Sequence, residues 1–147
     1  MKIFKNRKAY HNYFFLQEFE AGIVLQGTEV KSVRSGKLNF KDSFARIEDN
    51  EIWLYHMHIS VYERGSYSNH EPERKRKLLL NRREIKKIMK YTEEKGMTLI
   101  PKEVLINDKG LVKVNVAIAK GKKTYDKRDT LKEKDALRDA QRRMKNL

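Results

Sequence analysis

The sequence predicts a mainly β protein with short helices at its periphery and a basic tail at its C-terminal end. Several short segments alternate apolar with polar residues, which is typical of strands with one buried face. The chain carries 34 lysines and arginines against 20 acidic residues, and after residue 119 it offers only a thin apolar seam. A length of 147 residues suits one domain with one core. We therefore expect a compact body over residues 1–119 and a tail over residues 120–147.

Composition narrows the classes of function. A net charge of +14 favours a polyanionic partner. Nucleic acid is the first candidate, and an anionic membrane surface, which would require an amphipathic helix with large apolar residues, is the alternative. The chain has no cysteine, so it can form neither a disulfide framework nor a thiolate metal site. It also lacks a signal-peptide run and a stretch of roughly 20 apolar residues. These features predict a soluble cytoplasmic protein.

The first third of the chain predicts a basic arm, a long strand and a short helix. The arm leads into a strand over residues 13–20, which is rich in aromatic residues, and Gly22 predicts a bend before the strand continues. Residues 27–36 predict a helix. Thr28 can cap its first turn, and Gly36 can end it in the left-handed conformation.

The middle third predicts two strands, a loop and a capped helix. The strands cover residues 43–48 and 51–60, and the second is apolar on both faces, so it should lie deep in a meander. Residues 62–77 predict a loop that ends in a basic run. Asn81, with Glu84 three residues later, predicts the capping box of a following helix.

A hairpin is the clearest element of the last third. Residues 98–106 and 111–119 form its strands, and the polar residues 107–110 form its turn. Pro101 predicts an edge or a bulge in the first strand, because proline cannot donate a ladder hydrogen bond.

The tail carries eleven basic and five acidic residues from Lys120 onward. Its apolar seam is too narrow to offset an ordering cost of roughly 1–2 kcal/mol per residue. We therefore expect the tail to be disordered in isolation and helical on a partner. Residues 119–128 hold Gly121 and one aromatic, Tyr125, among lysines and arginines, a combination that suits contact with RNA. A solvated linker is the alternative interpretation of this stretch.

Three further positions are candidates for RNA contact. His11 and Tyr13 are two residues apart at the entry to the first strand, so we expect their rings to project together beside Lys8. Aromatic rings beside cations are what unpaired bases bind. The alternative is that Tyr13 belongs to the core. Glu20 is acidic in a basic neighbourhood, where it could accept from base amino groups, order Arg34, or simply face solvent.

The sequence contains little that predicts catalysis. It has no glycine-rich phosphate loop, no nucleophile motif and no His-Glu-x-x-His helix. His56 and His58 share a face of the expected strand and could both touch a metal, but no third ligand is evident. We expect neither an enzyme nor a cofactor.

Seven blocks of the sequence, in one order along essentially the whole chain, resemble the small protein B family of bacterial tmRNA-binding (SsrA-binding) proteins. The blocks lie at residues 6–9, 20–23, 27–32, 53–55, 76–80, 119–123 and 126–128. The resemblance implies an oligonucleotide-binding (OB-fold) antiparallel barrel with peripheral short helices. It also implies binding to the tRNA-like domain of tmRNA and delivery to stalled ribosomes for trans-translation. The tail would then probe the empty mRNA channel and the decoding centre.

The resemblance also implies specific site residues and partners. The family positions that contact tmRNA correspond to Asn6, Lys8, His11, Tyr13, Glu20, Leu79 and Asn81. Those at or near the decoding centre or late in the tail correspond to Lys122, Lys123, Tyr125, Asp126, Lys127, Arg128, Arg143, Met144 and Lys145. Arg143 departs from the family's Ile-Met-Lys-like element, and Tyr125 stands where some relatives carry histidine. The expected partners are tmRNA, small-subunit rRNA and, through aminoacylated tmRNA, elongation factor Tu, and we expect a monomer.

Overall fold

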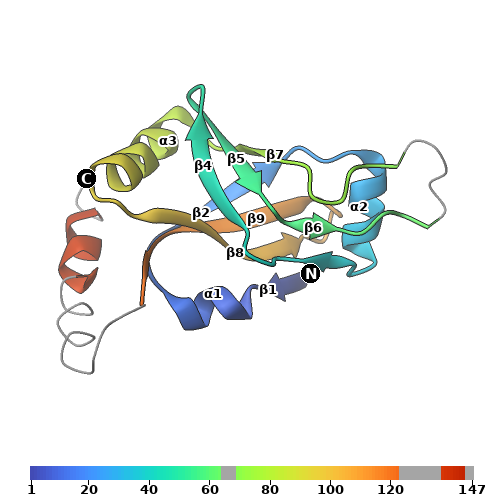
Figure 1. Ribbon diagram of the computed structural model, residues 1–147, viewed down its shortest axis with the longest axis horizontal. Coiled ribbons are helices and arrows are strands. Elements are labelled where there is room, and N and C mark those ends of the chain that lie inside the picture. The colour runs from blue at the N-terminus through green and yellow to red at the C-terminus, as the bar shows by residue number, and fades with distance from the viewer. Residues whose placement is uncertain (64–68, 123–136, 145–147) are drawn as a thin grey trace.

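A closed antiparallel barrel forms the body of the protein. The computed structural model describes residues 1–63, 69–122 and 137–144 (Figure 1). Seven strands lie in the order β1-β8-β4-β5-β7-β2-β9, and β8 also pairs with β9, which closes the ring. The strands are β1 (Lys2–Lys5), β2 (Tyr13–Ile23), β4 (Phe44–Glu48), β5 (Glu51–Tyr55), β7 (Arg76–Leu79), β8 (Thr98–Ile106) and β9 (Val112–Gly121). The predicted mainly β barrel with short helices is confirmed.

The long strands β2, β8 and β9 carry the core. The predicted hairpin is present as β8 and β9, and Val114, Val116 and Ile118 of β9 are fully buried. Burial of each such side chain contributes about 1.5–3 kcal/mol of hydrophobic stabilisation. Pro101 lies at a register shift between Pro101 and Glu103, so the predicted bulge is confirmed. In β2 the register shift falls between Phe15 and Gln17 rather than at the expected bend.

Two predicted helices are present, with one change of cap. Helix α3 (Arg82–Met89) has the predicted capping box, in which Asn81 Oδ1 accepts from the Glu84 amide at 2.8 Å. It continues as the π-helical turn η1 (Lys90–Glu94). Helix α2 (Gly27–Arg34) is capped by Gln26 and not by Thr28. The backbone amide of Gln26 donates to Glu29 Oε1 at 2.8 Å, because Glu29 occupies the third helical position and its side chain can reach back.

The structure differs from the sequence predictions at several elements. Strand β1 lies in the expected basic arm and pairs with β8. Helix α1 (Arg7–Asn12) replaces the expected strand entry, because Asn6 caps its N-terminus. Strand β7 lies in what the sequence predicted as the end of a charged loop. The strand expected over residues 51–60 is broken at His56, whose φ is +67°. Beyond that break the short strand β6 (His58–Ile59) pairs with β3 (Leu38–Asn39) in a separate sheet.

A buried ionic cluster explains how a basic run can enter the barrel as β7. Glu29 of α2 and Arg76 of β7 are both fully buried, and Arg76 Nε donates to Glu29 Oε2. Arg74 adds a second pair to Glu29 Oε1 at 2.6 Å. Burial alone would raise the pKa of the Glu29 carboxyl, but the hydrogen bonds from Arg74 and the Gln26 amide and the charge of Arg76 outweigh it, so the pKa lies below its ordinary value. The cluster fastens α2 onto the barrel.

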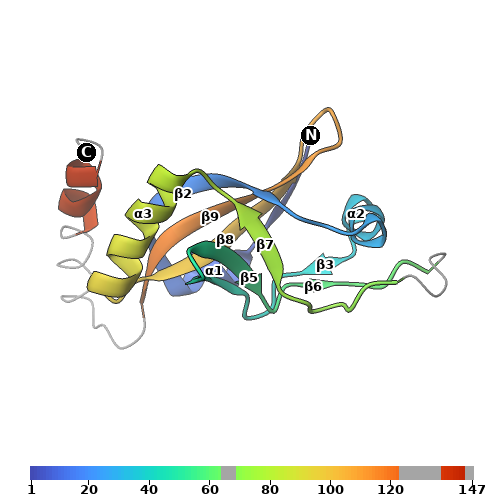
Figure 2. The same cartoon turned by 90° about the horizontal axis from the view of Figure 1, so that it is seen from above.

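The C-terminal region is partly described. Strand β9 continues to Gly121, two residues past the expected boundary at residue 119. Residues 137–144 are helical and lie beside α3 in both views of the ribbon (Figures 1 and 2). Leu137 and Met144 are buried in the same hydrophobic cluster as Ile88 of α3. The expectation of a tail without structure in isolation stays a prediction, and residues 123–136 and 145–147 lie outside the described residues.

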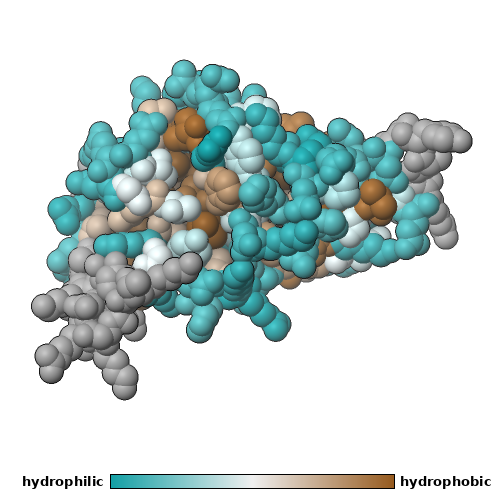
Figure 3. All heavy atoms as spheres, viewed as in Figure 1, coloured by the Kyte–Doolittle hydropathy of each residue, from teal (hydrophilic) through white to brown (hydrophobic). Residues whose placement is uncertain are grey.

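The surface of the barrel reflects the high content of charged residues in the sequence. The face in Figure 3 is mostly hydrophilic, with hydrophobic residues in small separate groups. Among the described residues, no helix combines the length and the apolar character needed to cross a bilayer.

Candidate RNA interface

The outer face of the barrel around Gly22 brings together two of the predicted RNA-contacting positions, Glu20 and Leu79. Gly22 of β2 pairs with Leu79 of β7 on one side and with Lys113 of β9 on the other. Residues paired across strands share a face, and Glu20 lies two residues from Gly22 on that same face. We call Glu20, Gly22, Leu79 and Lys113 the β2 outer cluster.

The glycine brings two strands into close contact at this cluster. A Cβ atom added at Gly22 would lie 3.2 Å from the Cβ of Leu79, so Leu79 lies directly against the bare backbone. Leu79 is nevertheless 51% exposed. A large exposed apolar side chain on the same barrel face as a carboxylate on β2 and an ammonium group on β9 suits a nucleotide, whose ring is apolar on its faces and polar at its edges.

Lys113 was not among the predicted site residues. The alternation of residues 111–119 places it off the core face, but its position opposite Gly22 depends on the register between β2 and β9. That register is a long-range property, and no local motif in the sequence signals it. Glu20 is exposed, whereas Arg34, its suggested partner, donates to the Gly110 carbonyl at 3.0 Å. The observed side-chain partner of Arg34 is thus the Gly110 carbonyl and not Glu20.

Asn81 follows β7 and adds a polar group beyond Leu79. It is exposed, and its Oδ1 is engaged in the α3 capping box. Its predicted role in RNA contact is therefore combined with a structural role at the start of the helix.

A second group of predicted positions lies on and beside α1. Asn6 is 5% exposed, and its side chain donates to the Pro101 carbonyl at 2.8 Å and accepts from the Ala9 amide at 3.3 Å. Asn6 therefore positions α1. Lys8 is exposed and pairs with Asp42 at 2.6 Å, and the hydrogen bond to Asp42 raises the pKa of the lysine. His11 is exposed on the helix and does not share a strand face with Tyr13.

Tyr13 lines a cleft beside this helix. It is half-buried at the start of β2, in a cleft of about 290 Å³ whose walls include Lys8, Ala9 and Ile100. The hydroxyl of Ser43 also lines the cleft and is buried without a hydrogen-bond partner. An aromatic ring, a cation and a free polar group in one cleft can hold a nucleobase. Tyr13 thus lines the cleft and also packs against the small hydrophobic cluster of Ala9, Ile100 and Ala119.

The root of the tail joins this second group. Tyr13 pairs with Gly121 of β9, and the Lys122 amide donates to the Asn12 carbonyl at 2.9 Å. The ammonium group of Lys122 lies 4.9 Å from the centre of the Phe14 ring. We call Lys8, His11, Tyr13 and Lys122 the α1 cluster. It adds cations and rings at the point where the tail leaves the barrel.

The structure describes only two of the remaining predicted tail positions. Arg143 is exposed and Met144 is 2% exposed. The predictions at Lys123, Tyr125, Asp126, Lys127, Arg128 and Lys145 lie outside the described residues.

The two clusters stand at opposite ends of one strand. Tyr13 and Gly22 are both in β2, and nine residues of extended chain span roughly 30 Å. Among the residues that the structure describes, no group of three histidine or acidic side chains could hold a metal ion. His56 and His58 do not share a strand, because the positive φ of His56 ends β5. The arrangement is suited to a long polyanion held at two points.

A closed antiparallel barrel that carries exposed cations, rings and the exposed Leu79 on its outer face defines an RNA-binding protein of the OB-fold class. The family model described as SmpB protein matches residues 3–146. An SsrA-binding protein from Thermoanaerobacter pseudethanolicus is 55% identical over 143 residues, which are 97% of this chain and 91% of the relative. The chain belongs to the SmpB family.

Other relatives agree with this assignment. An SsrA-binding protein from Caldanaerobacter subterraneus subsp. tengcongensis is 56% identical over 143 residues, which are 97% of this chain and 90% of the relative. A solved chain from a study described as "tmRNA-SmpB: a journey to the center of the bacterial ribosome" is 48% identical, with a TM-score of 0.71. That match covers 86% of this chain and 89% of the solved chain.

Proposed function

We propose that this protein binds the tRNA-like domain of tmRNA and delivers it to stalled ribosomes for trans-translation. The observation that carries the proposal is the β2 outer cluster, where Gly22 lets Leu79 lie against bare backbone on the face that also carries Glu20 and Lys113. Membership of the SmpB family and the similarity to a chain of a tmRNA–SmpB ribosome structure support it. The protein acts by binding and has no catalytic step of its own.

We propose that the barrel and the tail engage different RNAs. The β2 outer cluster and the α1 cluster hold tmRNA, with Asn6 and Asn81 fixing the elements that present them. The tail beyond β9 enters the vacant mRNA channel, where Lys123, Tyr125, Asp126, Lys127 and Arg128 approach the decoding centre and Arg143, Met144 and Lys145 lie further along. Lys122 stands at the boundary between the two surfaces. Elongation factor Tu is then a partner only through aminoacylated tmRNA, and the protein acts as a cytoplasmic monomer.

A pair of truncations tests the separation of the two functions. A chain ending at Lys122 keeps the pairs of β9 with Phe14 and Tyr13, whereas a chain ending at Ala119 loses both. We expect the chain ending at Lys122 to bind the tRNA-like domain with affinity within about threefold of the full chain and to fail in a tagging assay with stalled ribosomes. Loss of tmRNA binding by this chain, with its circular dichroism spectrum unchanged, would contradict the division of labour.

A pair of substitutions tests the site on the barrel. Leu79→Ala removes the exposed leucine and should weaken binding to the tRNA-like domain about tenfold, a loss typical of an interface residue of this size. Leu111→Ala is the matched control, because Leu111 is 54% exposed and lies outside both clusters. Equal affinities of the two variants in a gel shift would show that the β2 outer cluster is not the binding site.

A further inference from the structure

Half-buried aromatic rings line the outer face of β4 and β5, outside both clusters described above. The two strands lie side by side and pair in antiparallel register, with Phe44 opposite Tyr55 and Arg46 opposite Trp53 (Figure 1). Leu54, which lies between the two rings of β5, is 1% exposed and belongs to the core. Because side chains alternate along a strand, the rings of Trp53 and Tyr55 lie on the opposite, outer face.

The rings form a platform with cations over it. The rings of Phe44 and Tyr55 are stacked, with 5.4 Å between their centroids and 11° between their planes. The Arg46 guanidinium lies 5.1 Å from the centre of the Tyr55 ring, and the Lys75 ammonium group lies 4.6 Å from the centre of the Trp53 ring. Unpaired bases stack on aromatic rings and on arginine planes, and nearby cations neutralise their phosphates. The face therefore has the chemistry that single-stranded RNA requires.

One carboxylate holds the rings and the cations in place. Glu48 of β4 accepts hydrogen bonds from the Tyr55 hydroxyl and from Arg46 Nη2, the latter at 2.8 Å. Its second oxygen accepts from Lys75 Nζ at 3.1 Å. These bonds lower the pKa of Glu48 to about 2, so the carboxylate is ionised at neutral pH. The side chains of Arg46 and Lys75 are nevertheless 62% and 48% exposed, so both cations can still reach a phosphate.

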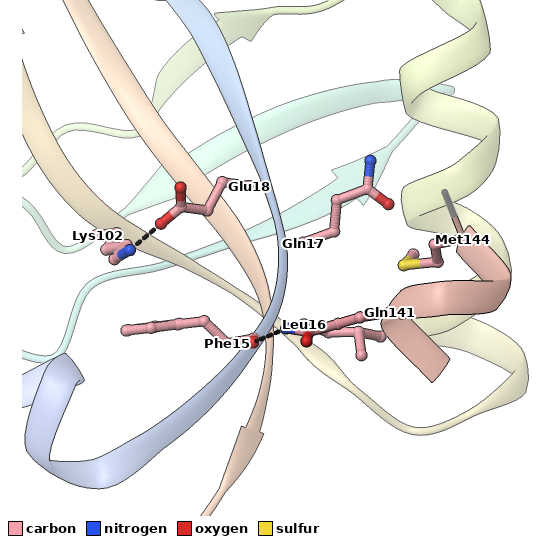
Figure 4. Close-up of a pocket in the computed structure, with 7 residues that line it drawn as sticks. All are labelled: Phe15, Leu16, Gln17, Glu18, Lys102, Gln141 and Met144. Carbon is pink, nitrogen blue, oxygen red and sulfur yellow. Dashed lines mark hydrogen bonds and ion pairs between the residues drawn. The ribbon is translucent and has the colours of Figure 1, made fainter. Parts of the chain in front are cut away.

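A similar group elsewhere on the barrel lacks an exposed cation. Lys102 of β8 pairs with Glu18 of β2 (Figure 4). Its ammonium group also lies 5.0 Å from the centres of the Tyr10 and Phe15 rings. The Lys102 side chain is only 17% exposed, so its charge is enclosed by its own partners. Of the two groups, the one on β4 and β5 is the one that a ligand can reach.

The platform adjoins a cleft on one side and the α1 cluster on the other. The cleft, of about 290 Å³, lies between β4 and the end of α3, and its walls include Phe44, Arg46 and Met97. Phe44 and Tyr13 both pack against the small hydrophobic cluster that contains Ile100. The platform is therefore continuous with a surface that the proposed function already assigns to RNA.

We propose that the outer face of β4 and β5 is a third RNA-binding surface, which holds a single-stranded segment by stacking. Its members are Phe44, Arg46, Trp53, Tyr55 and Lys75. Bases stack on the rings and on the Arg46 guanidinium, while Lys75 moves from the Trp53 ring to a phosphate. An exposed cation–π contact is weak, so a base can replace the lysine over the ring. A duplex is excluded, because its bases are already stacked on one another and present only their edges.

The fluorescence of Trp53 reports on this surface directly, because the chain has no other tryptophan. The probe is a single-stranded RNA of about ten nucleotides, a length within the range that one barrel of this kind covers. We expect it to quench the Trp53 fluorescence of the full chain in a saturable manner. The same RNA annealed to its complement is the control and should quench little, although it carries more charge.

Two substitutions separate stacking from charge. Tyr55→Ala removes a ring of the platform and should weaken binding of the single strand about tenfold, a loss typical of one stacking partner. Tyr62→Ala is the matched control, because the half-buried Tyr62 ring contacts Lys31 of α2 and lies off this face. Arg46→Gln should reduce the slope of log binding constant against log salt concentration by about 0.7, the effect of one neutralised phosphate. Arg83→Gln, at an exposed position on α3, should leave the slope unchanged.

Each outcome supports or overturns the surface on β4 and β5. A single strand that leaves the Trp53 fluorescence unchanged, or a duplex that quenches it equally, would overturn the proposal. Equal affinities of Tyr55→Ala and Tyr62→Ala, with circular dichroism spectra like that of the parent, would do the same. If Tyr55→Ala does not fold, an unchanged salt slope in Arg46→Gln still overturns it. The probe contains no tRNA-like domain, so failure of this test would leave the proposed function standing.

Discussion

Removing one partner of the buried ion pair of Glu29 and Arg76 gives a quantitative test of how α2 is held to β7. In Arg76→Met the carboxylate of Glu29 loses the Arg76 guanidinium, and the carbonyls of Met57 and Pro72 lose donors at 2.7 and 3.0 Å. Removing one partner of a buried pair costs about 3–5 kcal/mol. Arg74 still donates to Glu29 at 2.6 Å, so we expect the lower end, about 3 kcal/mol.

Urea denaturation, followed by circular dichroism and by the fluorescence of the single tryptophan, measures this loss. Arg83→Met is the control, because Arg83 is exposed on α3 and its substitution should change the free energy of unfolding by less than about 0.5 kcal/mol. The double variant Glu29→Gln with Arg76→Met should recover part of the loss, because it leaves no unpaired buried charge. An Arg76→Met variant within about 1 kcal/mol of the parent would refute the view that the pair fastens α2 to β7.

Three other predictions address pH and charge. The pKa of Glu29 in the folded state lies below its ordinary value of 4.5, so the unfolded chain takes up the proton first as the pH falls. The free energy of unfolding should therefore drop below about pH 4.5, and the drop should be smaller in Glu29→Gln. Hydrogen bonds from Tyr55, Arg46 and Lys75 lower the pKa of Glu48 to about 2, so Tyr55→Phe should raise it in a carboxyl-detected NMR titration, and an unchanged value would contradict that cause. Lys113→Ala should weaken tmRNA binding and reduce the slope of log binding constant against log salt concentration by about 0.7–0.9, because Lys113 is expected to neutralise one phosphate. An unchanged slope would show that Lys113 does not contact the RNA.

Local signals in the sequence predicted most of the elements correctly. The capping box at Asn81, the hairpin turn at residues 107–110 and the bulge at Pro101 depend on residues a few positions apart. The physical cause of each is contained in its own segment, and the structure confirms all three. The same is true of Gly36, whose φ of +74° ends the α2 region as expected.

The errors occur where a distant partner decides the conformation. A basic run such as residues 74–77 predicts a loop, because a buried arginine is costly without a carboxylate. The carboxylate is Glu29, 47 positions earlier in the chain, and nothing near Arg76 signals it. Helix α1 was missed for a related reason, because Asn6 caps the helix while also donating to Pro101 on β8.

The candidate site shows the same division between local and distant causes. The charge pattern of the sequence singled out Glu20 and the resemblance to the SmpB family supplied Leu79, but their placement on one face with Lys113 follows from the register of β2 with β7 and β9. A shift of one residue in either register would turn the paired side chains to the opposite face. The geometry of the β2 outer cluster is therefore a property of the closed barrel.

Strand β2 links the two clusters that we assign to tmRNA. The α1 cluster lies at its start, and the β2 outer cluster lies near its end. A paired strand in a closed barrel is rigid, so the roughly 30 Å between Tyr13 and Gly22 is a fixed spacing. An RNA that uses both clusters must present two contacts at that separation on a folded scaffold, because a flexible single strand would gain little from a fixed spacing. If tmRNA uses both clusters as proposed, the barrel selects it by shape, and the tail, which leaves the barrel beside the start of β2, can engage a second RNA without displacing the first.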